Sequence, residues 1–94
     1  MTLTFIYNIK SAKCRHFQKI ESPRERYEYL LKGEILAKRW IDVENYREFY
    51  RPEINGVFVM EDLPKIKRFR SIKTAIKEGQ RLRNLIRLEL AKLD

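Results

Sequence analysis

The last quarter of the chain is a long amphipathic segment, and it constrains the fold more than any other feature. With Ile72 set at zero and about 100° of turn per residue, its apolar side chains fall within an arc of about 120°. A stripe of this width can dock on a core, and Ser71 with Thr74 is typical of a helix start. We therefore predict a helix over residues 71–93 that packs through Ile72, Ala75, Ile76, Gly79, Leu82, Ile86, Leu90 and Leu93.

The other side of this segment is basic. Residues 62–94 hold ten basic and four acidic side chains, and residues 1–20 hold four basic and none acidic, whereas residues 21–61 hold seven basic and nine acidic. The net charge of +8 therefore comes from the two ends of the chain. Such an uneven distribution favours an anionic partner, although lysines and arginines that serve only solubility are the plain alternative.

The first half of the chain combines strand and helix signals. The alternation in Thr2–Lys10 predicts a strand, and Cys14–Ile20 is predicted to return as a second strand with Phe17 facing inward. Ser22-Pro23-Arg24-Glu25 joins a capping box to a proline at the first helical position, so a helix begins at Pro23. The apolar pattern extends this helix to Ile41, and Gly33 inside it indicates close approach of another element.

The middle of the chain predicts a short helix and a hairpin. Asp42 is expected to cap a helix over residues 43–50, which Pro52 ends. Asn55-Gly56 is typical of a type I′ turn, and Val57–Met60 reads as a strand after it. The partner strand, Arg51–Ile54, is expected at a sheet edge because of Pro52.

These elements predict one α+β domain over residues 1–94. Its small antiparallel sheet has two to four strands and carries helices on one side. Two longer helices cover residues 23–41 and 71–93, and one short helix covers residues 43–50.

The sequence offers little for catalysis or metal binding. Cys14 and His16 would share one face of a strand, but no acidic residue nearby in sequence would orient the histidine. One cysteine and one histidine are too few for a structural zinc site, and three glycines make no phosphate-binding loop. We expect a protein that is not an enzyme and that has no metal and no cofactor.

The single cysteine and the amino terminus bear on location. One cysteine cannot form an intramolecular disulfide, which indicates a reducing compartment. The apolar run at the amino terminus is too short to span a bilayer and lacks the basic start of a signal peptide. We therefore expect a cytoplasmic protein that does not engage a membrane.

Part of the chain resembles a winged helix-turn-helix. Leu36-Ala37-Lys38-Arg39-Trp40, the polar stretch to Tyr50, the hairpin around Asn55-Gly56 and the run Glu61–Ile66 are similar to small excisionase-type and winged-helix DNA-binding proteins. The resemblance covers about a third of the chain and implies that Asp42–Tyr50 enters a major groove while the hairpin touches the backbone. The chain departs from the pattern in its preceding strand and in the acidic Glu44 and Glu48.

The leading hypothesis is a small nucleic-acid-binding accessory protein, acting on DNA or RNA. Cations four residues apart on a helix form a row that can follow phosphates, and the cations before the helix add an anion-attracting start. The residues expected to contact phosphates are Lys67, Arg68, Arg70, Lys73, Lys77, Arg81 and Arg87.

A second hypothesis is a protein-interaction module of phage or plasmid type that inhibits or regulates a larger nucleic-acid-handling machine. Small size, the lack of a catalytic set and several tyrosines support it, because aromatic residues dominate interface energetics. Leu85 and Leu88 project away from the apolar stripe, which also raises homodimerisation as a hypothesis. The residues expected at a protein interface are Tyr46, Phe49, Tyr50, Leu85 and Leu88.

Overall fold

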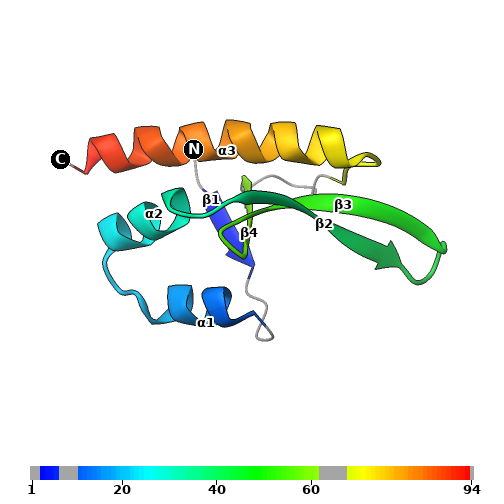
Figure 1. Cartoon of the computed structure of the whole chain (residues 1–94), viewed down its shortest axis with the longest axis horizontal. Helices are drawn as coiled ribbons and strands as arrows, with labels where there is room; N and C mark the ends of the chain where they lie inside the picture. Colours follow the sequence, from blue (N-terminus) through cyan, green and yellow to red (C-terminus); the bar gives the residue numbers. More distant parts are fainter. Residues whose placement is uncertain (1–2, 7–10, 62–67, 94) are drawn as a thin grey trace.

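The computed structural model describes residues 3–6, 11–61 and 68–93 and confirms the α+β class (Figure 1). Four strands form one antiparallel sheet in the order β1-β4-β3-β2. A single long helix ends the described chain, as predicted. The elements in chain order are β1 (Leu3–Ile6), α1 (Ala12–Lys19), α2 (Pro23–Leu31), β2 (Ile35–Asp42), β3 (Arg47–Ile54), β4 (Val57–Glu61) and α3 (Ile72–Lys92).

The pairing register divides the sheet into two faces, because residues directly opposite one another share a face and neighbours along a strand alternate. We call the face that bears Ile54 and Val57 the inner face. It also carries Leu3, Phe5, Ile35, Ala37, Arg39, Ile41, Glu48, Tyr50, Pro52, Val59 and Glu61. The outer face carries the described side chains of Leu36, Lys38, Trp40, Asp42, Arg47, Phe49, Arg51, Glu53, Phe58 and Met60.

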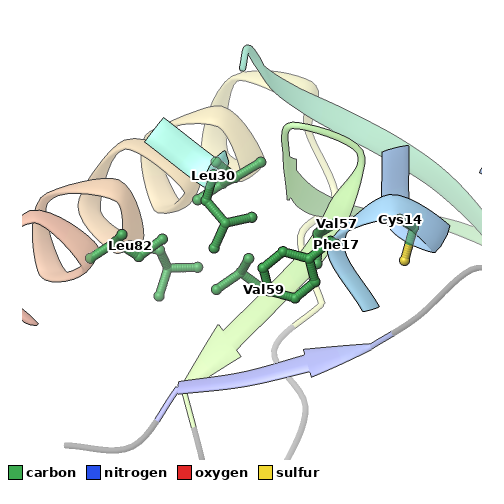
Figure 2. Close-up of a cluster of buried hydrophobic side chains, with 8 residues drawn as sticks. Cys14, Phe17, Leu30, Val57, Val59 and Leu82 are labelled. Atoms are coloured by element: carbon green, nitrogen blue, oxygen red, sulfur yellow. The ribbon is translucent and has the colours of Figure 1, made fainter. Parts of the chain in front are cut away.

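All three helices pack on the inner face. Figure 2 shows side chains of α1, α2 and α3 converging on β4. The ring of Phe17 meets that of Phe5 edge to face, with 5.1 Å between centroids. Burying each large aliphatic or aromatic side chain stabilises the fold by about 1.5–3 kcal/mol. The core cluster consists of Cys14, Phe17, Leu30, Ile54, Val57, Val59, Leu82 and Ile86.

The long helix α3 forms as the amphipathic pattern predicts. The Ser71 hydroxyl accepts a hydrogen bond from the Thr74 backbone N–H at 3.1 Å and caps the first turn. Ile72 and Leu93, at the two ends of the predicted stripe, are exposed. The middle of the stripe is buried: Ala75, Gly79, Leu82 and Ile86.

The strand expected over Cys14–Ile20 is wrong, since this segment is the helix α1. Ser11 caps it by accepting a hydrogen bond from the Cys14 backbone N–H at 3.3 Å. Cys14 and Phe17 are three residues apart, which places both on the buried side of a helix. A strand would have turned them to opposite faces.

The helix predicted over residues 23–41 begins correctly at Pro23 but ends at Leu31. The remainder is the strand β2, which pairs with β3 along its full length. Apolar residues lie on almost every side of the predicted helix. The segment therefore lacks the single apolar stripe that distinguishes an amphipathic helix from a strand. The period-two alternation of Lys38 and Trp40 with Ala37 and Arg39 is what the sheet uses.

The short helix predicted over residues 43–50 is also wrong. Asp42 does act as a cap, but its Oδ1 accepts from the backbone N–H groups of Glu44 (3.1 Å) and Asn45 (3.4 Å) to close a turn. Tyr46 completes that turn with a φ of 51°, and β3 starts at Arg47. Since residues 42–50 form a hairpin, they provide no recognition helix, and the winged-helix resemblance fails there.

The Asn55-Gly56 turn is confirmed. Both residues have positive φ, 49° and 79°, as a type I′ turn requires. The strand before it is internal rather than at an edge. Tyr50 exchanges backbone hydrogen bonds with Phe69, and β4 pairs with β3 from Glu53 onwards. Pro52 lies in the gap between these two pairings, where a residue without an N–H is tolerated.

Candidate functional site

The outer face of the sheet carries no helix among the described residues, and it holds an unusual pairing of aromatic rings with arginine. Trp40 is 36% exposed, whereas Phe49 and Phe58 retain only 7% and 5% of their surface. Trp40 and Phe49 are direct partners across β2 and β3, and Phe58 lies on β4. An apolar surface of this kind needs something to shield its buried rings.

Arg51 provides much of that shield. Its guanidinium carbon lies 4.7 Å from the ring centroid of Trp40, 4.9 Å from Phe49 and 5.2 Å from Phe58. All three distances lie within cation–π range. Its buried Nε has no hydrogen-bond partner, and Arg51 forms no ion pair with any described residue. The site therefore holds a partly buried cation without a counter-ion in the described chain, which is costly unless an anion binds.

A second arginine approaches the same rings. The guanidinium carbon of Arg68 lies 4.7 Å from the Phe49 centroid, and its Nη1 is 3.2 Å from Asp42 Oδ2. Burial, and to a lesser extent the charge of Arg68, lower the pKa of Arg51. The pKa of Asp42 is lowered too, first by the hydrogen bond from the Asn45 side chain, with Arg68 contributing. The five residues Trp40, Phe49, Arg51, Phe58 and Arg68 are called the aromatic–arginine cluster below.

The charges around this cluster are imperfectly balanced. Lys38 lies directly opposite Arg51 across the strands, an arrangement of like charges that weakens strand pairing. Glu53 is the nearby acid on β3, and burial raises its pKa while Lys38 partly offsets that shift. Two cations held opposite one another, on a sheet face that no described helix covers, are explained if the face receives an anion.

Glu53 supplies a test of this electrostatic description. Folding raises the pKa of Glu53, so ionisation of this carboxyl group destabilises the folded protein. The free energy of unfolding therefore falls as the pH rises from the carboxyl pKa of the unfolded chain through the higher pKa of the folded protein. We expect Glu53→Gln to be more stable than the parent at neutral pH, with the difference shrinking in acid. Urea unfolding across a pH series measures this. Glu34→Gln, at an exposed position, is the control, and a less stable Glu53→Gln at neutral pH would contradict the description.

A pocket of about 310 Å³ continues the site towards the β2–β3 hairpin. Three arginines line it, Arg47, Arg68 and Arg70, together with the acids Asp42 and Glu48. Asp42 pairs with Arg68, and Glu48 pairs with Arg39 at 3.2 Å. Arg47 and Arg70 are exposed and form no ion pair within the described chain, so the pocket adds positive charge beside the cluster.

Comparison with known proteins gives no further guide to the site. The chain matches no protein-family model, no curated protein and no solved structure.

The cations predicted to contact phosphate do not form one surface. Arg68 and Arg70 lie beside the outer face. The other described ones lie on α3, which covers the inner face: Lys73 and Lys77 are exposed, Arg81 pairs with Glu78 and Glu61, and Arg87 donates to Asn84 Oδ1 at 2.8 Å. Glu78 raises the pKa of Arg81 most, followed by Glu61. Lys67 lies outside the described residues.

The residues predicted at a protein interface are also dispersed. Tyr46 is 88% exposed at the hairpin turn. Phe49 belongs to the outer face, whereas its neighbour Tyr50 belongs to the inner face. Leu85 packs against the core cluster. Of the two leucines, therefore, only Leu88, at 60% exposure, projects into solvent as expected.

Cys14 and His16 do not share a face, as they would have on the strand predicted over Cys14–Ile20. On the helix α1, Cys14 is buried and His16 is exposed, with its ring 5.0 Å from that of Tyr29. Among the residues that the structure describes, no three side chains of His, Cys, Asp or Glu gather as metal ligands would. Within the same residues, no helix has the length and apolar character to cross a bilayer.

Sequence reasoning missed Lys38, Trp40, Arg51 and Phe58. Reading residues 23–41 as a helix assigned Trp40 to a core, and reading Arg51 as part of a short edge strand left it without a role. A period-two reading of Leu36–Asp42 and Arg47–Glu53 was the available signal. It would have put Lys38 and Trp40 on one face of the first strand and Phe49 and Arg51 on one face of the second.

Proposed function

We propose that this protein binds single-stranded nucleic acid on the outer face of its sheet and is not an enzyme. The observation that carries the proposal is Arg51, a cation held by three aromatic rings and lacking a carboxylate partner in the described chain. An uncovered four-stranded sheet that presents aromatic and basic side chains is a recurring platform for single strands.

Trp40 is the residue suited to stack on a base. It is the exposed ring of the cluster, and its contact with Arg51 fixes one side of the indole. Stacking a base on an aromatic side chain contributes about 1–3 kcal/mol and tolerates any base, because every base has a π face. A duplex keeps its bases stacked inside, so this contact favours a single strand.

Arg51, Arg68 and Lys38 are suited to meet phosphates around that base. Arg51 and Arg68 both approach Phe49, and Lys38 lies opposite Arg51. A phosphate placed among these cations would relieve their mutual repulsion. The exposed Arg47 and Arg70 extend the positive surface towards the hairpin, which suits a strand running along β2 and β3.

A titration against salt tests the proposal. Three phosphate contacts predict that the logarithm of the binding constant for a single strand falls with the logarithm of salt with a slope of about −2. Fluorescence anisotropy of a labelled single-stranded oligonucleotide measures the slope, with a duplex of the same sequence for comparison. Binding that is insensitive to salt, or tighter binding of the duplex, would contradict the proposal.

A protein-interaction role is the second candidate, supported by one group of exposed apolar side chains. Leu36, Ile41, Val43 and Tyr46 are all exposed on β2 and the hairpin turn that follows it. Retention of a protein partner after nuclease treatment, together with loss of that partner on Tyr46→Ala, would favour this role. In either role the buried Cys14 thiol suits a reducing, cytoplasmic setting.

A further inference from the structure

The strand β2 forms one edge of the sheet, and the backbone groups on its outer side bond to no other described residue. The Asn55 N–H donates to the Glu34 carbonyl at 3.0 Å, which makes Glu34 and Asn55 a hydrogen-bonded pair. Since such pairs alternate along an antiparallel ladder, the even-numbered residues of β2 bond to β3. The backbone groups of Ile35, Ala37, Arg39 and Ile41 therefore point outward.

This edge is long and apolar where it leaves the body of the protein. Trp40 and Leu36 are exposed on its outer face, and Ile41 is 54% exposed on its inner face. The hairpin of β2 and β3 extends past the start of α3 (Figure 1), so none of the described helices covers its tip. A long edge strand with exposed apolar side chains is a template for pairing with another strand.

We propose that β2 pairs with β2 of a second copy of this chain, in an antiparallel register centred on Trp40. In a symmetric antiparallel pair of β2 strands, one residue must lie on the two-fold axis, directly opposite its own copy. Only this arrangement places the outward-pointing, odd-numbered residues of one strand opposite odd-numbered residues of the other, so that their backbone groups can bond. Centring the axis on Lys38 or Arg39 would place two like charges directly opposite one another, which destabilises strand pairing. Centring it on Ala37 gives no pair of opposite charges.

The register centred on Trp40 has a charge complementarity that the registers centred on Ala37, Lys38 and Arg39 lack. It places the two Trp40 rings opposite each other at a non-hydrogen-bonded position, where side chains approach most closely. Lys38 then faces Asp42 of the second copy, and this opposite-charge pair occurs twice by symmetry. Arg39 and Ile41 of the two copies form the hydrogen-bonded pairs on either side. All of these contacts come from the same short stretch of edge, as an isologous interface requires.

Charged residues on an edge also serve monomeric proteins, because they deter unwanted pairing. Lys38 and Arg39 would do so here against most strands. Against a second β2 in this register, however, Lys38 meets a carboxylate rather than a cation. The same two residues would therefore favour this self-pairing register over the registers centred on Lys38 and Arg39.

Pairing of this kind would join two four-stranded sheets into one continuous sheet. The two-fold axis would run perpendicular to the sheet, so the outer faces of both copies would lie on the same side of the joined sheet. Two aromatic–arginine clusters would then be adjacent on one surface. The pairing is argued from the edge alone and does not depend on nucleic-acid binding.

Ile41→Pro tests the pairing at the backbone. The N–H of Ile41 points outward, so proline leaves the bonds between β2 and β3 intact and removes one donor from each of the two central pairs. Ile41→Ala keeps the N–H and is the matched control. Sedimentation velocity on nuclease-treated protein measures the mass across a range of micromolar concentrations. We expect the parent and Ile41→Ala to reach twice the chain mass of 11.5 kDa and Ile41→Pro to remain at 11.5 kDa.

Charge and fluorescence provide a second readout that does not use proline. Lys38→Glu would place two acids opposite one another and should shift the dimer to monomer, while far-UV circular dichroism stays unchanged. Trp40 is the single tryptophan, so its emission should move to shorter wavelength as the parent associates. A parent that stays monomeric, or a dimer that survives both Ile41→Pro and Lys38→Glu, overturns the proposal. Either result leaves the salt titration of single-strand binding to be judged separately.

Discussion

Trp40→Ala is expected to weaken single-strand binding by about 5- to 150-fold, the equivalent of losing one stacked base at about 1–3 kcal/mol. The indole is the exposed ring of the aromatic–arginine cluster, and it also contacts the Arg51 guanidinium at 4.7 Å. Removing it takes away the stacking surface and loosens the cation beside it. Anisotropy of a labelled oligonucleotide measures the affinity without depending on tryptophan emission.

Two variants of the same strand separate stacking from general effects. Trp40→Phe keeps an aromatic ring at this position and should recover most of the affinity. Ile41→Ala removes an exposed apolar side chain from the adjacent position on the inner face and should change the affinity little. Equal losses for Trp40→Ala and Ile41→Ala would show that the outer face has no special part in binding.

Gly33→Ala is expected to destabilise the fold by about 2–5 kcal/mol, a large part of what a small domain has. A β-carbon at Gly33 would overlap with the Cβ, Cγ and Oδ1 atoms of Asn55. That side chain cannot easily move, because its Nδ2 donates to the Tyr29 carbonyl at 2.8 Å and its backbone N–H bonds to Glu34. Urea unfolding measures the loss.

A double-mutant cycle identifies the cause of this loss. Asn55→Gly removes the side chain that obstructs residue 33 and still suits a type I′ turn. In that background Gly33→Ala should cost little, giving a coupling of more than about 1 kcal/mol between the two positions. Additive losses would mean that the overlap with Asn55 does not account for the effect.

The sequence predicts well those elements whose signals are local. Ser22 and Ser71 each accept the backbone hydrogen bond expected of a cap, and Asn55-Gly56 forms the expected turn. The close approach expected at Gly33 is also present, although Gly33 follows a helix rather than lying within one. Ser11 carries a cap signal of the same kind, which the strand predicted over Cys14–Ile20 leaves unused. Local chemistry therefore places the starts of helices better than it places their ends.

The period-two signal in β2 and β3 is too weak to place these strands by itself, because pairing decides them. Leu36–Trp40 has apolar residues at spacings that a helix also tolerates, and only β3 opposite it makes the strand favourable. The aromatic–arginine cluster depends on the same pairing. Trp40 and Arg51 are far apart in sequence and meet because the Asp42 turn sets the register. Residues that are brought together by the pairing register of β2 and β3 can be assigned to one site only when that register is known.

The central claim is that the outer face of the sheet, rather than the exposed side of α3, meets nucleic acid. Two double variants test it directly, because each removes two positive charges. Arg51→Gln with Arg68→Gln changes the outer face, and Lys73→Gln with Lys77→Gln changes the helix. Thermal unfolding of each variant confirms that it is folded before its affinity is measured.

The salt dependence of single-strand binding is the decisive measurement. The account predicts that the outer-face variant loses at least about 10-fold in affinity and that its salt slope becomes shallower by about 1.4, the share of two phosphate contacts. The helix variant should keep the parent's slope and nearly all of its affinity. A larger loss in the helix variant, with the outer-face variant binding like the parent, would contradict the account.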